Sequence, residues 1–421
     1  MALISLKEAK TLALASVRVQ PLRRVPLHEA FGRFLAEPAL ASRPSPAFDN
    51  AAMDGFAVSS PDTKGASAAA PAKLKLQGEL HAGAPLPDTD LRSGHAMRVF
   101  TGAPLPFGAD AVVHLEDAAE VSGVIHVPAE VPPGHSVRRR GEEYLANELL
   151  VSAGRRLDAA ALGILAAAGQ GQVPVYLQPR VAIVTCGDEL VEPGQVPAPH
   201  QVHDANGALL SGLVREAGGV VHAVVRVADR DAELRAALEQ LAAEADVIVT
   251  AGGASVGGRD RLKAVAQALG GTLGFDGVAI KPGRPVGLAL IRQVPVALLP
   301  GNPGAAMVAF DQLVRPMLLK AQGVFEHRHV ERAALQVAQR KQPGLTVFLP
   351  AQLDRTQAGG PVVRPRKVAP GQLLGLLGID GWLVLPSGQS DFPAGAQVEL
   401  ETFGQATHTP LSLGLGDEIT R

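Results

Sequence analysis

The pattern of apolar and polar positions changes several times along the 421-residue chain. Within residues 5–40 apolar residues recur at helical spacing, and a second short helical stretch is expected over 27–35. The first apolar stripe consists of Leu6, Ala9, Leu12, Ala13 and Val17. From residue 44 to about 140, short apolar runs alternate with Gly and Pro, which is typical of a small β domain. These runs lie at 73–76, 97–100, 111–115 and 124–127.

Helical spacing returns at 158–168, where Asp158 is placed to cap the helix. From residue 180 to about 322 continuous apolar runs alternate with helical stretches, which predicts a doubly wound, three-layer α/β domain. The apolar runs lie at 180–185, 220–227, 246–250 and 294–299, and the helical stretches at 208–217, 231–243, 261–269 and 305–319. Strand patterns at 382–385 and 397–400 predict a small C-terminal β domain.

Composition narrows the class of protein. With 47% hydrophobic and 19% charged residues, the chain has apolar material for several cores, which excludes a disordered or fibrous protein. Its net charge of −2 gives no general field that favours nucleic acid or an anionic membrane. No apolar segment is long enough to cross a bilayer, and the lone Cys186 suits a reducing compartment. We therefore expect a cytoplasmic protein with no nucleic-acid or membrane partner.

Three glycine-rich loops follow predicted strands of the α/β domain, at 186–190, 251–260 and 300–304. Ligands of open α/β sheets bind beyond the carboxyl ends of the strands, where glycines let backbone N–H groups approach an oxyanion. Each loop alone could be an ordinary turn, but three at one sheet edge favour an anion or nucleotide pocket. None of the three loops matches the dinucleotide-binding or P-loop pattern, so the sequence does not favour either of these two kinds of nucleotide site.

Charged residues accompany these loops. Lys281 and Arg284 lie in a segment that two prolines and a glycine stiffen, and Glu189, Asp229 and Asp260 each follow a predicted strand. Carboxylates beside an anion site are unfavourable unless a divalent cation such as Mg²⁺ lies between them and the phosphates. Together these residues predict metal-assisted phosphate chemistry. Taken singly, each could be a helix cap or a solvated surface charge.

Two further segments carry concentrated charge. Residues 48–58 place two acids and an Asn around a turn, and residues 137–143 set three arginines against two acids. Arginine forks suit phosphate or molybdate-like oxyanions, with a solvated turn as the alternative for 138–140. The histidines show no metal-ligand spacing and Cys186 has no recognisable His partner, so we expect neither a zinc site nor thiol catalysis. Cys186 is interpreted as a small loop residue.

Taken together, the motifs resemble the MoeA family of molybdopterin molybdenumtransferases, which is also similar to the E domain of gephyrin. The matching segments occur in the family's order and cover nearly the whole chain up to about residue 322. They lie at 46–58, 101–106, 138–142, 185–190, 252–257, 279–285 and 299–303. The combination is far more specific than any single glycine loop.

The resemblance implies a homodimer of four-domain subunits, with each active site between the α/β domain of one subunit and the first two domains of the other. The implied division is an elongated helical domain at 1–44 with 140–176, an inserted β domain at 45–139, an α/β molybdopterin-binding domain at 177–327, a C-terminal β domain at 328–410 and a tail at 411–421.

The implied activity is Mg²⁺-dependent insertion of molybdate into adenylylated molybdopterin, with release of AMP. A molybdopterin adenylyltransferase and other cofactor-biosynthesis proteins would be partners. By resemblance the catalytic residues would be Asp54, Glu189, Asp229, Asp260 and Lys281, with Asp229 and Asp260 helping to hold Mg²⁺. The residues expected to bind substrate are Thr101, Arg138, Gly187, Asp188, Gly252, Gly253, Ser255, Gly257, Arg284, Pro300, Gly301, Asn302 and Pro303.

The sequence also departs from the family pattern. Arg259 and Gly277 stand where an aromatic and a basic residue are usual, and Glu143 replaces an Asp. An arginine expected shortly after Phe348 is absent, and leucines and glycines at 373–378 replace a serine-containing stretch. These differences leave open a tungstate-preferring variant. Two further alternatives rest on the fold: a non-catalytic scaffold that binds molybdopterin, as in the gephyrin branch, and an enzyme of the related adenylyltransferase step, which shares the α/β domain.

Overall fold

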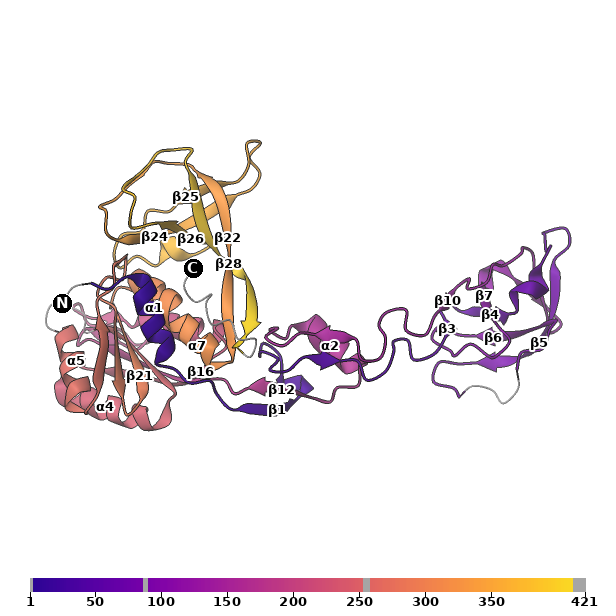
Figure 1. Ribbon diagram of the computed structural model, residues 1–421, viewed down its shortest axis with the longest axis horizontal. Coiled ribbons are helices and arrows are strands. Elements are labelled where there is room, and N and C mark those ends of the chain that lie inside the picture. The colour runs from indigo at the N-terminus through magenta and orange to yellow at the C-terminus, as the bar shows by residue number, and fades with distance from the viewer. Residues whose placement is uncertain (1–2, 86–89, 253–257, 412–421) are drawn as a thin grey trace. The chain divides into compact units, whose positions relative to one another are not determined.

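A computed structural model describes residues 3–85, 90–252 and 258–411 (Figure 1). The chain divides into two compact units. One comprises Met1–Glu37, Ser152–Leu162 and Gly171–Arg421, and the other comprises Pro38–Val151 and Gly163–Gln170. The first unit holds an α/β sheet and a C-terminal β domain, and the second holds a separate β domain. The predicted class, multidomain α/β plus β, is therefore confirmed.

A six-stranded sheet forms the centre of the first unit. In the order β16-β13-β17-β21-β20-β18, the first four strands are parallel and the last two run antiparallel to their neighbours. The strands are β13 Arg180–Cys186, β16 Val220–Val227, β17 Val247–Gly252, β18 Thr272–Asp276, β20 Gly287–Ile291 and β21 Val294–Leu299. The four parallel strands were predicted, whereas β18 and β20 were not.

Helices cover both faces of this sheet (Figure 1). Along β13, Val181 and Ile183 pack with α1, α3 and α6, whereas Ala182 and Val184 face α4 and α5. The helices are α1 Leu6–Ala15, α3 Ala205–Glu216, α4 Asp231–Glu244, α5 Gly258–Ala268 and α6 Pro303–Ala309. This arrangement confirms the doubly wound, three-layer domain. In the described part of the chain, no helix is both long and apolar enough to cross a membrane.

The N-terminal segment departs from the sequence prediction. Helix α1 confirms the first apolar stripe, but the second helix, predicted over 27–35, is wrong. The chain instead forms strand β1 (Leu22–Pro26) and a single 3₁₀ turn, η1 (Leu27–Glu29). Two features explain this: Gly32 adopts φ +75°, which interrupts a helix, and Phe34 and Leu35 form antiparallel bridges with Arg156 and Val175. Strand β1 itself pairs antiparallel with β12 (Gln172–Tyr176).

Helix α1 packs on the α/β layers. Ala9 and Ala13 are buried in the same core as Phe310, and the Nζ of Lys320 donates a hydrogen bond to the Leu14 carbonyl at 2.7 Å. The implied four-domain division, which groups residues 1–44 with 140–176, stays a prediction.

The helix expected over 305–319 contains an irregular turn. Helix α6 leads into a π-helical turn, η4 (Phe310–Val314), and then into α7 (Arg315–Ala321). Pro316 has no backbone N–H, so the regular α-helical hydrogen-bond ladder cannot continue through this point. The turn places the polar residues Asp311 and Gln312 in the interior, where both are buried.

The C-terminal β domain is a sheet in the order β19-β24-β25-β22-β28-β26, and a further β24–β26 pairing closes it on itself. Its strands are β19 Ile280–Lys281, β22 Val324–Leu335, β24 Thr346–Asp354, β25 Val362–Pro365, β26 Gly381–Leu385 and β28 Gln397–Pro410. The two strands predicted in this region are confirmed, and β19 comes from the segment that carries Lys281.

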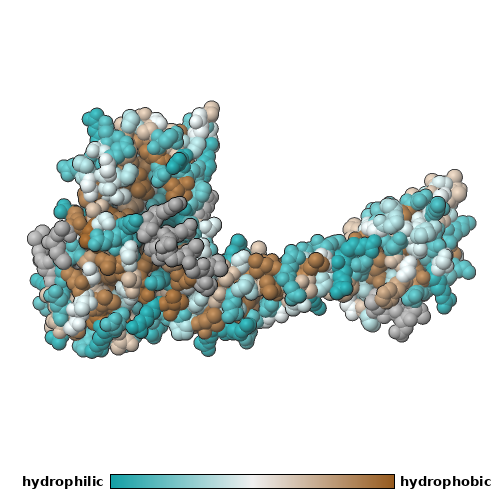
Figure 2. All heavy atoms as spheres, in the orientation of Figure 1, coloured by the Kyte–Doolittle hydropathy of each residue, from teal (hydrophilic) through white to brown (hydrophobic). Residues whose placement is uncertain are grey.

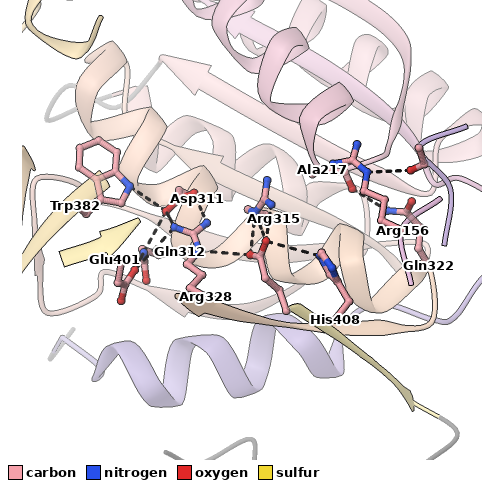
Figure 3. Close-up of polar contacts among 12 residues, drawn as sticks. Arg156, Ala217, Asp311, Gln312, Arg315, Gln322, Arg328, Trp382, Glu401 and His408 are labelled. Atoms are coloured by element: carbon pink, nitrogen blue, oxygen red, sulfur yellow. Dashed lines mark hydrogen bonds and ion pairs between the residues drawn. The ribbon is translucent and has the colours of Figure 1, made fainter. Parts of the chain in front are cut away.

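A buried ionic cluster connects the α/β domain to the C-terminal β domain (Figure 3). Arg328 donates two hydrogen bonds to the Asp311 carboxylate, at 2.6 and 2.5 Å. The Trp382 Nε1 donates to the same carboxylate at 2.9 Å, and Arg315 donates to both oxygens of Glu326. Burial lowers the pKa of Arg328, but the charges of Asp311 and Glu326 outweigh burial and raise that pKa above its usual value.

The second unit contains a sheet in the order β7-β4-β6-β5-β9-β8. Each of the four predicted apolar runs falls on one of its strands, which confirms a small β domain. The strands are β4 Gly55–Val58, β5 Ala72–Leu80, β6 His95–Val99, β7 Ala111–His114, β8 Ala119–Val121 and β9 Val124–Val127.

Short elements complete the described chain. The predicted cap of α2 (Ala159–Ala167) is confirmed, because Asp158 Oδ1 accepts a hydrogen bond from the Ala161 backbone N–H at 2.8 Å. The short strands are β2 Ala39–Leu40, β3 Asn50–Ala51, β10 Val137–Arg138, β11 Leu149–Val151, β14 Leu190–Val191, β15 Val202–His203, β23 Gln339–Arg340 and β27 Asp391–Phe392. The remaining 3₁₀ turns are η2 Ser60–Thr63, η3 Leu115–Asp117 and η5 Leu374–Leu376.

Candidate active site

The carboxyl ends of four parallel strands meet at one edge of the α/β sheet. Strands β16, β13, β17 and β21 are adjacent in this order, so the loops that follow them lie side by side. Many of the predicted site residues lie at these strand ends or in these loops. Those that the structure describes are Gly187, Asp188, Glu189, Asp229, Gly252, Pro300, Gly301 and Asn302, and Pro303 begins α6. The topology therefore brings together at one edge residues that are far apart in the sequence.

Three carboxylates crowd this edge. The Asp229 backbone N–H donates a hydrogen bond to Asp188 Oδ1 at 3.1 Å. Burial raises the pKa of Asp229, and the nearby charges of Asp188 and Glu189 raise it further. A cation at this position would relieve the repulsion, and carboxylate oxygens are the ligands that Mg²⁺ prefers. Within the described residues, however, no group of three or more His, Cys, Asp or Glu side chains is assembled around a common metal position.

Glycines allow the loop backbones to approach each other closely. Gly252 has φ +95°, and a Cβ there would lie 2.1 Å from the Cys186 carbonyl oxygen. A Cβ on Gly301 would lie 3.2 Å from the Gly252 Cα. Any side chain at Gly252 would displace the neighbouring strand end, so the glycine keeps backbone groups at the surface of the site.

Polar residues that the sequence analysis missed support the Gly301 loop. Asn206 Nδ2 donates to the Gly301 carbonyl at 2.7 Å. Asp204, which is buried, accepts from the Thr185 hydroxyl at 2.7 Å and caps α3 by accepting from the Gly207 N–H at 2.9 Å. An Asp just before a helical stretch is a capping signal, so Asp204 could have been found from the sequence, but its link to Thr185 depends on the tertiary fold.

Lys281 lies on the short strand β19. This strand pairs with β24, with Lys281 opposite Val347, and the pairing fixes the backbone of the segment. Lys281 and Arg284 are both exposed, and in the described part of the chain neither forms an ion pair. Lys281 and Asn302 line a common cavity of about 620 Å³ that extends into the C-terminal β domain. Both cations are therefore available to an anion.

In the second unit the structure brings Asp54 and Thr101 together. Asp54 Oδ1 accepts hydrogen bonds from the Thr101 hydroxyl and from its backbone N–H, both at 2.7 Å. These two bonds lower the pKa of Asp54, which is therefore ionised at neutral pH. Arg138 is exposed on β10 and pairs through its backbone with Asn50.

The arginine segment 138–140 is held by Asp49, which is one of the acids in the charged turn. Arg139 Nη1 donates to Asp49 Oδ2 at 2.8 Å, and the Arg140 backbone N–H donates to Oδ1 at 2.7 Å. Partial burial opposes ionisation of Asp49, but these hydrogen bonds outweigh it and lower its pKa. Arg139 thus forms an ion pair with Asp49 and Arg140 is held through its backbone, whereas the side chains of Arg138 and Arg140 form no ion pair among the described residues.

Some predicted residues lie outside what the structure describes. They are Gly253, Ser255 and Gly257, together with the side chain of Asp260. Cys186 corrects one interpretation, because it is the last residue of β13 and not a loop residue. Burial raises the pKa of its thiol to about 12, and the Asp229 charge adds to this effect, so the thiol stays protonated.

Comparison with known proteins decides the family. Three family models match consecutive parts of the chain: "MoeA N-terminal region (domain I and II)" at 4–169, "Probable molybdopterin binding domain" at 182–320, and "MoeA C-terminal region (domain IV)" at 332–403. Molybdopterin molybdenumtransferase 2 of Mycobacterium tuberculosis is 34% identical over 382 residues, which cover 89% of this chain and 94% of that protein. The chain belongs to the MoeA family.

Other MoeA relatives extend the match over nearly the whole chain. Molybdopterin molybdenumtransferase of Synechococcus elongatus is 33% identical over 95% of this chain and 100% of its own length. The crystal structure of a molybdopterin biosynthesis MoeA protein from Pyrococcus horikosii aligns with a TM-score of 0.78 and 32% identity, covering 96% of this chain and 100% of that one. The MoeA match therefore includes the diverged C-terminal β domain.

Proposed function

We propose that this MoeA protein is a molybdopterin molybdenumtransferase, which inserts molybdate into adenylylated molybdopterin with release of AMP. The observation that carries the proposal is the sheet edge at which Asp188, Glu189 and Asp229 meet the glycine loops, in a chain whose full-length relatives bear this name. A protein that served only as a scaffold would have no need for three mutually repelling carboxylates at this edge.

Several described residues have the charge or the accessible backbone that this reaction requires. Lys281 and Arg284 are exposed cations without carboxylate partners among these residues, so they can bind the phosphates or the molybdate oxyanion. Gly301 is exposed and Gly252 is partly exposed, so their backbones are accessible to a ligand. The hydrogen bonds from Thr101 keep Asp54 ionised, so Asp54 is a weak base. It is better suited to positioning a cation than to accepting a proton.

We propose further that the reaction depends on Mg²⁺. Asp229 and Asp260 would hold the ion, with Asp188 and Glu189 nearby and with water and substrate oxygens completing the coordination. When bound, Mg²⁺ would neutralise charge on the phosphates. The chain is also expected to act as a cytoplasmic homodimer that receives its substrate from a molybdopterin adenylyltransferase.

Two carboxylate substitutions test this assignment. Asp54→Asn and Asp260→Asn should each abolish formation of molybdenum cofactor from adenylylated molybdopterin and molybdate, because each removes a charge that the reaction needs. Asp117→Asn is the matched control, since Asp117 is an exposed acid of the second unit outside the proposed site. Full activity in either Asp54→Asn or Asp260→Asn would refute the role proposed for that residue.

A further inference from the structure

A serine and a histidine of the second unit form a close polar pair outside the residues assigned above to molybdenum transfer. Ser136 Oγ lies 2.6 Å from Nε2 of His114, which is hydrogen-bonding distance. Among the residues that the structure describes, Ser136 is the only serine whose hydroxyl is hydrogen-bonded to a histidine. A hydroxyl held against an imidazole is the arrangement in which a histidine takes the proton of a nucleophilic serine.

The backbone around Ser136 is fixed on both sides. The Val112 N–H, on the same strand β7 as His114, donates to the His135 carbonyl at 2.9 Å, and the Ala52 N–H donates to the Ser136 carbonyl at 2.9 Å. Ser136 has φ +51°, a left-handed conformation that a residue with a Cβ adopts when its surroundings impose it. The serine and the histidine are therefore held in place before any ligand binds.

The imidazole of His114 is the base of this pair. Its ring stacks on that of His135, with the ring centroids 5.4 Å apart. Asp117 Oδ2 lies 3.5 Å from Nδ1 of His114, but this distance is too long for a strong hydrogen bond, and the carboxylate is 66% exposed, so water screens its charge. The arrangement is therefore a serine–histidine dyad and not a triad that depends on Asp117.

A substrate can reach the pair from solvent. The His114 side chain is 32% exposed, and Ser136 is partly exposed. Figure 2 shows that hydrophilic residues predominate on the face of the second unit turned to the viewer. A small, water-soluble ester suits such a surface better than an ester with a long lipid chain.

We propose that Ser136 and His114 form a nucleophilic site that hydrolyses small, water-soluble carboxylic esters. In the first step Ser136 Oγ bonds to the ester carbonyl carbon, its proton passes to Nε2 of His114, and the bond to the alcohol oxygen breaks as the alcohol takes that proton. Water then attacks the acyl-serine, gives a proton to Nε2 and releases the acid as Ser136 regains its proton. This inference goes beyond the proposed function, because it needs neither molybdopterin nor molybdate.

The probe is p-nitrophenyl acetate, mixed with the full-length protein. We expect an initial burst of p-nitrophenolate that approaches one equivalent per chain, with the acetyl group located on Ser136 by mass spectrometry of peptides. Ser122 is an internal control, because it is exposed and has a similar φ of +52°, but its hydroxyl has no histidine partner within the described chain. We expect no acetyl group on Ser122.

Three variants test the dyad. Ser136→Gly removes the hydroxyl, and glycine adopts a positive φ without strain, so this variant should fold as well as the wild type and show no burst. His114→Gln should lower the acylation rate about 100-fold, because it removes the base. Asp117→Asn should change that rate by less than about twofold.

Three results would overturn the proposal: no acetyl group on Ser136, a burst that persists in Ser136→Gly, or an equal acylation rate in His114→Gln and the wild type. A loss in Asp117→Asn as large as that in His114→Gln would contradict the dyad. Molybdenum transfer is measured separately on the same preparations, so a failure of this site and a failure of the proposed function remain distinguishable.

Discussion

Asp229 combines an unfavourable electrostatic position with a proposed functional role. Burial and the charges of Asp188 and Glu189 raise its pKa. A carboxyl group whose pKa is raised on folding destabilises the protein as pH rises through that pKa, so ionised Asp229 weakens the fold at neutral pH.

We therefore expect Asp229→Asn to raise the urea midpoint of unfolding at pH 7 while lowering molybdenum transfer by about 100-fold or more. Urea denaturation and an AMP-release assay on the same preparation measure the two effects. A less stable variant would contradict the electrostatic account, and unchanged transfer would contradict the functional one.

The lowered pKa of His408 leads us to expect that the stability of the first unit depends on pH. This pKa is lowered to about 4, chiefly by burial. The charge of Glu326 raises this pKa, and the charges of Arg315, Arg156 and His327 lower it further. In the unfolded chain the pKa of a His side chain is about 6.5, so the unfolded state takes up the proton first as pH falls. Stability is therefore full above about pH 6.5 and declines towards pH 4.

Thermal unfolding midpoints of the wild type at pH 7, 6 and 5 measure this decline. His408→Gln cannot titrate in this range, so its midpoint should vary less with pH. An equal slope in the wild type and the variant would show that other groups cause the decline.

Among single residues, the sequence identified those with a local signature and missed those defined by tertiary contacts. Gly252 and Asn302 come shortly after the predicted apolar runs 246–250 and 294–299, and a glycine or a capping residue after such a run is readable from the sequence alone. The hydrogen bond between Thr185 and Asp204 joins a strand to a helix cap and has no local pattern. The ionisation of Asp54 likewise depends on Thr101, which is distant in the sequence.

At the scale of elements, the π-helical turn η4 and strand β22 are joined by the buried pair Asp311 and Arg328. Replacing Arg328 with Met leaves the Asp311 carboxylate buried without its cation, which we expect to destabilise the protein by about 3 kcal/mol or more. Arg340→Met is the matched control, because the Arg340–Asp391 pair is exposed, and it should change stability by about 1 kcal/mol or less. Urea denaturation of both variants measures the difference, and equal losses would contradict the account.

Elements with a strong, uninterrupted pattern were predicted and those set by prolines or pairing were not. The parallel strands read as continuous apolar runs because both of their faces are buried. The segment 27–35 has helical spacing, but the positive φ of Gly32 and the bridges that Phe34 and Leu35 form with distant residues override it. Strands β18 and β20 carry glycines, which weaken a strand pattern, and their place at the sheet edge follows from the hairpin with β21.

For the whole molecule, the net charge of −2 conceals a local separation of charge. One edge of the α/β sheet gathers Asp188, Glu189 and Asp229, while Lys281 and Arg284 remain exposed without carboxylate partners in the described chain. The fold class followed from the alternation of strands and helices. The location of the charges could be expected only in outline, because it depends on which loops the strand order makes neighbours.

The most direct test of the central claim is product analysis on the full-length protein. Adenylylated molybdopterin, Mg²⁺ and molybdate are mixed with the chain, and AMP and dithiolene-bound molybdenum are quantified in the same sample. We predict that AMP and molybdenum cofactor form in equal amounts, and only when molybdate and Mg²⁺ are both present. Substrate that binds but is never converted, or AMP release that does not depend on molybdate, would contradict the account.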